Sequence, residues 1–162
     1  MGITGYLKIE EIPGESLRAE HEDEIDVHGA HWRIAQKSGT SMGSGLTQAR
    51  AEVGSLTVHK FYDAASAYLA HSSMRGTSFP EMIFYARKDS GEAHLDYLTI
   101  TMTNCIISGY EMDNDGSDPD VQMISERVSI AFEKVKIMYT VQAEDGSAGD
   151  EHEIEYDIVA GA

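Results

Sequence analysis

The segment Glu24-Ile25-Asp26-Val27-His28-Gly29-Ala30-His31-Trp32-Arg33-Ile34 changes the phase of its apolar side chains halfway along. In an extended chain Ile25 and Val27 lie on one face and Trp32 and Ile34 on the other, because side chains alternate with a period of two. All four reach one core only if a β-bulge or sharp bend lies between them, and Gly29 tolerates such geometry. The segment therefore predicts a long, bent strand that wraps a closed or strongly curved sheet.

A second phase change lies in the longest extended run of the chain, residues 121–141. Phe132 ends one apolar phase and Val135 begins the other, so a second bend is expected near Glu133-Lys134. Alternating apolar and polar residues predict further strands over 6–12, 55–61, 81–88, 93–110 and 154–158.

The period changes in the alanine-rich segment Asp63–His71, where Tyr68 and Leu69 predict one apolar helical face. Asp63 is the expected N-cap, and Gly76 lies beyond the expected end. Many strands and one flanking helix indicate a mainly β fold, a closed antiparallel β-barrel with the helix packed on it. The length of 162 residues fits one domain over 1–162.

Residues 37–54 form a Gly/Ser-rich segment with few apolar side chains to offset the entropy lost on ordering. Composition alone favours a flexible surface loop. The alternative is an extended arm that orders only against another subunit.

The charge of the chain excludes some classes of partner. With 28 acidic and 12 basic residues the net charge is −16, which argues against nucleic-acid binding and against docking on anionic lipid. The sequence contains no conventional signal peptide and no stretch long enough for a membrane span. We therefore expect a cytoplasmic protein that, if exported, leaves by a route that accepts the folded chain. Cys105 is the single cysteine and is expected to be buried.

Candidate chemistry is sparse. His28 and His31 have an odd spacing that places them on opposite faces of a strand, and no third ligand follows at metal-site spacing. The acidic loop Asp113–Asp120 resembles a calcium loop, but Gln122 stands where the bidentate Glu belongs. No nucleophile elbow, phosphate loop or dinucleotide motif is present, so we expect no enzyme, no cofactor and no dedicated metal site. A glycosidase-like carboxylate pair stays open as an alternative.

Several short motifs occur in a characteristic order along the chain. They are Glu24-Ile25-Asp26-Val27 leading to Trp32, Tyr62-Asp63-Ala64-Ala65-Ser66, Phe79-Pro80, Ala86-Arg87-Lys88, Tyr97-Leu98-Thr99-Ile100-Thr101 and Glu126-Arg127-Val128-Ser129-Ile130-Ala131-Phe132. From about Tyr6 to the last strand, this set resembles the Hcp (haemolysin-coregulated protein) family, the tube subunit of bacterial type VI secretion. The resemblance implies a β-barrel with one helix that assembles into a homo-hexameric ring.

The resemblance also implies that rings stack into a hollow tube, which a contractile sheath expels with a spike protein at its tip. Effectors would travel in the lumen, and the protein itself would be secreted without a signal peptide. The lumen and effector-binding residues implied here are His31 and Arg33. The extended loop would contact a neighbouring ring, through Gly39, Met42, Gly43, Gly45 and Leu46. The main alternatives are a monomeric barrel that binds a small ligand and, less favoured, a carboxylate-dependent hydrolase.

Overall fold

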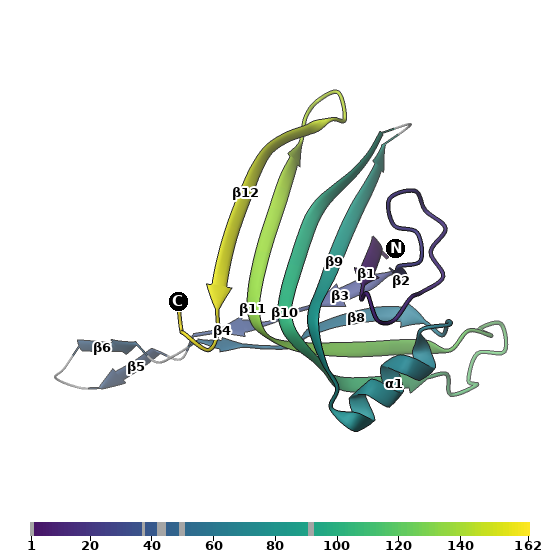
Figure 1. Ribbon diagram of the computed structural model, residues 1–162, viewed down its shortest axis with the longest axis horizontal. Coiled ribbons are helices and arrows are strands. Elements are labelled where there is room, and N and C mark those ends of the chain that lie inside the picture. The colour runs from purple at the N-terminus through teal and green to yellow at the C-terminus, as the bar shows by residue number, and fades with distance from the viewer. Residues whose placement is uncertain (1, 37, 42–44, 49–50, 91–92) are drawn as a thin grey trace.

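The computed structural model describes residues 2–36, 38–41, 45–48, 51–90 and 93–162. One large antiparallel sheet curves around the core, and one helix lies against it (Figure 1). The strands of this sheet are β1 (Thr4–Lys8), β2 (Ile25–Val27), β3 (Gly29–His31), β8 (Leu56–Phe61), β9 (Ser78–Ser90), β10 (Ala93–Asp113), β11 (Ser125–Gln142) and β12 (Ala148–Asp157). Two small ladders pair β4 (Ile34–Ala35) with β7 (Glu52–Val53) and β5 (Ser38–Ser41) with β6 (Gly45–Gln48).

The large sheet is open. Its strands follow the order β2-β1-β9-β10-β11-β8-β3, with β12 paired to β11, so β2 and β3 are the two ends of the path. The predicted closed barrel is therefore wrong, and the sheet is a half-barrel. The reason is local: only His28 separates β2 from β3, and antiparallel strands need a hairpin of about two residues before they can pair with each other.

The second bend lies where β10 and β11 cross the floor of the half-barrel (Figure 1). The ladder pairs Thr103 with Lys134 and Cys105 with Phe132, and Asn104 interrupts it between these pairs with a φ of 53°. The Asn104 Nδ2 donates to Oε2 of Glu133 at 3.0 Å. The bend expected near Glu133-Lys134 is confirmed.

The helix α1 spans Ser66–Arg75, so it begins and ends later than the predicted Asp63–His71. Ala65 is the N-cap residue, and the prediction of Asp63 at that position is wrong. Asp63 instead lies two residues before the N-cap and accepts the Ala65 N–H at 3.0 Å through Oδ1. Gly76 ends the helix in the left-handed region, with φ 62°, as its position after the alanine-rich segment indicated.

The segment Glu24–Ile34 places some of its apolar residues in the core and others at the surface. Ile25 and Val27 are buried, and Trp32 packs edge-on against Phe132 with ring centroids 6.0 Å apart. Ile34 is 56% exposed, so its predicted place in the core is wrong. Ile34 belongs to the β4–β7 ladder, which is not part of the large sheet.

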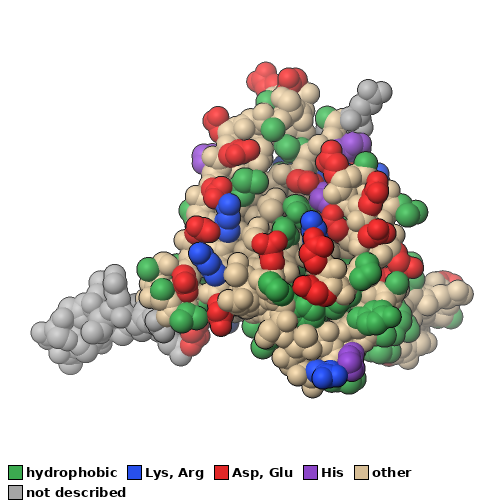
Figure 2. Space-filling model, viewed as in Figure 1, with side chains coloured by type: hydrophobic (Ala, Val, Ile, Leu, Met, Phe, Trp, Pro, Cys, Tyr) green, Lys and Arg blue, Asp and Glu red, His purple; other side chains and the backbone are tan. Residues whose placement is uncertain are grey.

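The core fills the inside of the curved sheet. Apolar side chains from the strands of the large sheet and from α1 form one cluster, which includes Leu7, Val58, Leu69, Phe84, Met102, Cys105 and Ile130. The expected burial of the single cysteine is confirmed. Acidic side chains far outnumber basic ones on the face seen in Figure 2. Within the described part of the chain, no helix is long and apolar enough to span a membrane.

Candidate functional site

Four neighbouring strands, β3, β8, β11 and β10, carry polar or small residues on the side opposite to the buried Val58 and Val128. Residues at facing ladder positions form two rows across these strands. One row holds His31, Thr57, Ser129 and Gly109, and the next holds Gly29, His59, Arg127 and Glu111. We call these eight residues the polar face. A hollow of about 700 Å³ lies over it.

The rows are packed across the strands. Thr57 Oγ1 and Ser129 Oγ are 2.9 Å apart and share a hydrogen bond. A Cβ on Gly29 would lie 3.2 Å from Cβ and 3.3 Å from Cδ2 of His59. Gly29 therefore leaves room for the His59 imidazole, which is a second reason for glycine at this position besides the bend predicted from the sequence.

His28 lies at the edge of the polar face, where the chain passes from β2 to β3. Its backbone N–H donates to the His59 carbonyl at 2.9 Å, and its ring is 4.4 Å from that of Phe61. Burial lowers the pKa of His59, and the positive charge of Arg127 and of the two neighbouring histidines lowers it further. His59 thus stays neutral to a lower pH than an ordinary histidine.

The structure places the two predicted lumen residues differently. His31 lies in the polar face and lines its hollow. Arg33 is exposed beyond the end of β3, where its carbonyl accepts the Gly54 N–H at 2.9 Å, and it does not line the hollow. His59 and Arg127 were missed, although the alternation of β8 and β11 around Val58 and Val128 could have placed both opposite the core.

The predicted ring-stacking segment contains a hairpin. β5 and β6 pair Gly39 with Thr47, Thr40 with Leu46 and Ser41 with Gly45. The hairpin extends away from the large sheet at the left of Figure 1. Met42 and Gly43, which belong to the same prediction, lie outside the described residues.

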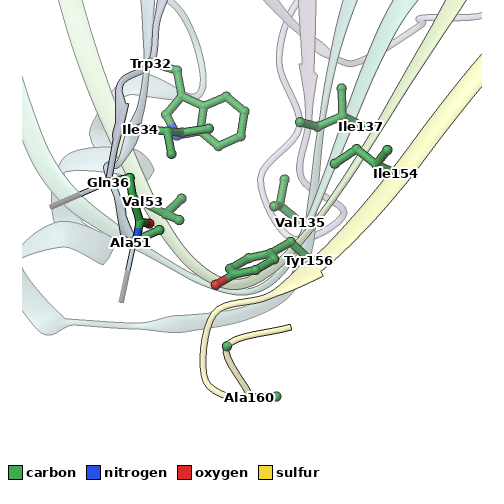
Figure 3. Close-up of a pocket in the computed structure, with 11 residues that line it drawn as sticks. Trp32, Ile34, Gln36, Ala51, Val53, Val135, Ile137, Ile154, Tyr156 and Ala160 are labelled. Carbon is green, nitrogen blue, oxygen red and sulfur yellow. The ribbon is translucent and has the colours of Figure 1, made fainter. Parts of the chain in front are cut away.

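An apolar groove lies between the β4–β7 ladder and the β11–β12 pair (Figure 3). Its volume is about 570 Å³. Trp32, Ile34 and Val53 line one side, while the other side includes Ile154 and Tyr156. Ile34 and Ile154 are 56% and 57% exposed, so two large aliphatic side chains face solvent across this groove.

The residues that invited comparison with metal sites have other partners. Asn114 Oδ1 accepts the Gly116 N–H at 2.9 Å, and Asp115 Oδ1 accepts the Ser117 N–H at 2.8 Å. The hydrogen bonds from Ser117 lower the pKa of Asp115. Among the residues described, no group of three or more His, Cys, Asp and Glu side chains is arranged to hold a metal ion.

The half-barrel of bent strands with one flanking helix defines a class of fold, and comparison with known protein families and structures identifies that class. A model of the family described as the type VI secretion system effector Hcp matches residues 6–139. The chain therefore belongs to the Hcp family of type VI secretion.

Individual relatives agree with this assignment. The protein hcp1 of Pseudomonas aeruginosa is 28% identical over 147 residues, which cover 91% of this chain and 89% of the relative. Hcp1 from Salmonella typhimurium is 30% identical with a TM-score of 0.79, covering 99% of this chain and 97% of that structure. A structure described as a type six secretion system protein has the same fold, with a TM-score of 0.89, 23% identity and coverage of 99% and 98%.

Proposed function

We propose that this protein is a structural tube subunit of type VI secretion, in which homo-hexameric rings stack into a hollow tube with the polar face turned toward the channel. The observation that carries the proposal is the two-row polar face itself. Its strands bury aliphatic side chains on one side and present small or hydrogen-bonding residues, such as Thr57 and Ser129, on the other. A water-filled channel requires such a lining.

Ring closure would cover surfaces that a monomer leaves exposed. The half-barrel ends at β2 and β3, and open sheet edges are sites where another chain can pair. The apolar groove exposes Ile34 and Ile154, a pair suited to the core of a subunit contact. Cyclic symmetry would repeat one such contact around the ring.

The proposed stacking of rings is assigned to the β5–β6 hairpin. It projects from the sheet and has polar and small residues in sequence, which suits an arm that orders against a neighbouring ring. Stacking of this kind is a head-to-tail contact, and such a contact can propagate into a tube. Gly39, Met42, Gly43, Gly45 and Leu46 remain the proposed stacking residues.

The partners follow from the same proposal. They are other copies of the chain, a spike protein at the tube tip, a contractile sheath and secreted effectors held in the lumen. The protein would begin in the bacterial cytoplasm and leave by type VI secretion without a signal peptide. It would act mechanically rather than as an enzyme, and it would need no cofactor.

The test is the state of assembly of the purified protein. Sedimentation velocity should show hexamers, and negative-stain electron microscopy should show rings with a central hole. Only monomers up to high micromolar concentration would overturn the proposal. The variant His31→Asp should change cargo retention while rings persist, whereas loss of rings in this variant would place His31 at a subunit contact instead.

A second function, a monomeric protein that binds a small ligand in the apolar groove, is favoured by one observation. The groove of about 570 Å³ beside Trp32 has the size and apolar lining of ligand sites. This alternative predicts a monomer whose Trp32 fluorescence responds to apolar dyes. The tube proposal predicts that the groove is covered in the ring and that dye binding falls as rings form.

A further inference from the structure

Two of the seven histidines lie in the polar face, and a third adjoins it through its backbone. His31 and His59 belong to the polar face, and His28 adjoins it through its backbone hydrogen bond to His59. The His59 imidazole lies over Gly29. The His28 ring packs against Phe61, and its Nε2 is buried with no hydrogen-bond partner among the described residues, so His28 does not belong to the exposed charged set. Arg127 stands opposite His59 in the ladder and adds a permanent positive charge.

Three exposed charged groups border the hollows at His31 and His59, namely Glu111 and Asp113 from β10 and Arg127 from β11. His28 also borders a separate hollow, lined by Glu15, Arg18, Asp26 and Asp63, which neither His31 nor His59 borders. Glu126 borders the smaller hollow beside His28, but its carboxylate is buried and paired with Lys60 on the core side. With neutral histidines the exposed set therefore carries one positive and two negative charges.

Protonation reverses this balance. Imidazolium groups on His31 and His59 would turn a net single negative charge into a net single positive charge. The remainder of the protein stays negative in mildly acidic solution, because its isoelectric point is about 4.6. The polar face would then be the place on an acidic protein where an anionic ligand finds attraction.

We propose that the polar face is a proton-controlled binding surface for acidic peptide segments of cargo, weak at neutral pH and stronger in mildly acidic solution. This inference rests on the proposed function, since it assigns the cargo chemistry of the channel. In a ring the same charge reversal would occur in every subunit around the channel. Burial and cationic neighbours lower the pKa of His59, so this residue gains its proton at a lower pH than an ordinary histidine.

The probe is a fluorescein-labelled hexaglutamate peptide, followed by fluorescence anisotropy at pH 5.5, 6.5 and 7.5 and constant ionic strength. Binding to the wild-type protein should tighten at least about tenfold from pH 7.5 to 5.5, as expected for two added positive charges at the binding surface. The variant His31→Gln/His59→Gln should lose most of this gain. The matched control His71→Gln/His152→Gln removes two exposed histidines elsewhere and should keep it.

Assembly is measured on the same samples by sedimentation. Rings whose hexaglutamate affinity does not change with pH would overturn this inference and leave the tube proposal standing. pH-dependent binding by a protein that forms no rings would support the surface and overturn the tube. Equal loss of binding in the two double variants would also overturn the inference, because the effect would then follow overall charge. A hexalysine peptide that tightens equally at low pH would overturn it as well.

Discussion

Lys60 Nζ lies 2.5 Å from Glu126 Oε1, and both side chains are fully buried. The ammonium group also donates to Asp63 Oδ1 at 3.0 Å and to Ser66 Oγ at 3.0 Å. The Tyr110 hydroxyl donates to the other oxygen of Glu126, and burial together with this carboxylate raises the pKa of Tyr110. The network therefore joins the start of α1 to β8, β10 and β11.

Removal of one partner should destabilise the fold strongly, because the other charge would stay buried without compensation. We expect Lys60→Met to lower the free energy of unfolding by about 3–5 kcal/mol. Lys60→Met/Glu126→Gln should recover at least half of that loss, since no unpaired charge is left. Urea unfolding followed by Trp32 fluorescence measures both variants.

A surface ion pair provides the control for this prediction. Lys136 and Glu153 are 3.0 Å apart, but both side chains are largely exposed. Lys136→Met should therefore leave the free energy of unfolding nearly unchanged. An equally small loss in Lys60→Met would refute the structural importance of the buried network.

His21 lies between two carboxyl groups and holds the segment before β2 against the sheet. Its Nδ1 is 3.0 Å from Glu24 Oε2, and its Nε2 is 2.9 Å from both carboxylate oxygens of Asp96. The ring stacks on Tyr6 with centroids 4.2 Å apart. Burial raises the pKa of Glu24 and outweighs the opposing effect of His21.

The free energy of unfolding should depend on pH because of this raised pKa. The folded state holds the Glu24 proton to a higher pH than the unfolded state does. Protonated Glu24 therefore contributes to the free energy of unfolding below the ordinary glutamate pKa of 4.5, and this contribution is lost as the pH rises through the pKa of Glu24 in the folded state. Compared with wild type, Glu24→Gln should therefore gain stability between pH 4.5 and pH 7. Denaturant unfolding across this range tests the trend. The exposed neighbour Glu22→Gln should show none, and a reversed trend in Glu24→Gln would contradict the assignment.

The sequence predicted the bends of this fold better than its closure. The phase change between Phe132 and Val135 identified the second bend, because a break in period-two alternation leaves few other ways to bury both sets. Alternation says which side chains face a core, but it does not say which strands are neighbours. The open ends at β2 and β3 and the exposure of Ile34 depend on pairing between distant segments, which a local pattern does not contain.

The same limit applies to the site. His31 was predicted from the family resemblance, whereas His59 and Arg127 lie beside it only because the ladders bring β3, β8 and β11 into register. Asp63 was expected at the N-cap from its residue type alone. Asp63 instead forms an ion pair with Lys60 and so belongs to the buried network, and the helix begins at Ser66.

Cys105 should be unreactive in the folded protein. Burial raises the pKa of its thiol to about 12, so the nucleophilic thiolate is scarce at neutral pH. We expect a thiol reagent such as DTNB to modify it at pH 8 only at the rate of unfolding, and completely in guanidinium chloride. Rapid stoichiometric reaction of the native protein would show that the site opens without unfolding.

The apolar groove supplies a test of subunit contact. Ile154→Glu places a charge on the exposed side of the groove, opposite Ile34, and should abolish rings because a charge buried at a contact without a partner is unfavourable. Far-UV circular dichroism should stay unchanged, since Ile154 lies at the surface. The conservative variant Ile154→Leu should retain rings. Hexamers in Ile154→Glu would place the subunit contact elsewhere.

Deletion of Gly39–Ala49 removes the β5–β6 hairpin and should separate stacking from ring closure. The hairpin belongs to its own two-stranded ladder, so its loss leaves every pairing of the large sheet intact. We expect single rings by negative-stain electron microscopy at concentrations where the wild-type protein forms stacks, with the mass of the ring by sedimentation reduced only by the deleted residues. A deletion variant that still stacks would show that ring-to-ring contact uses another surface, and one that no longer forms rings would place the hairpin between subunits of the same ring.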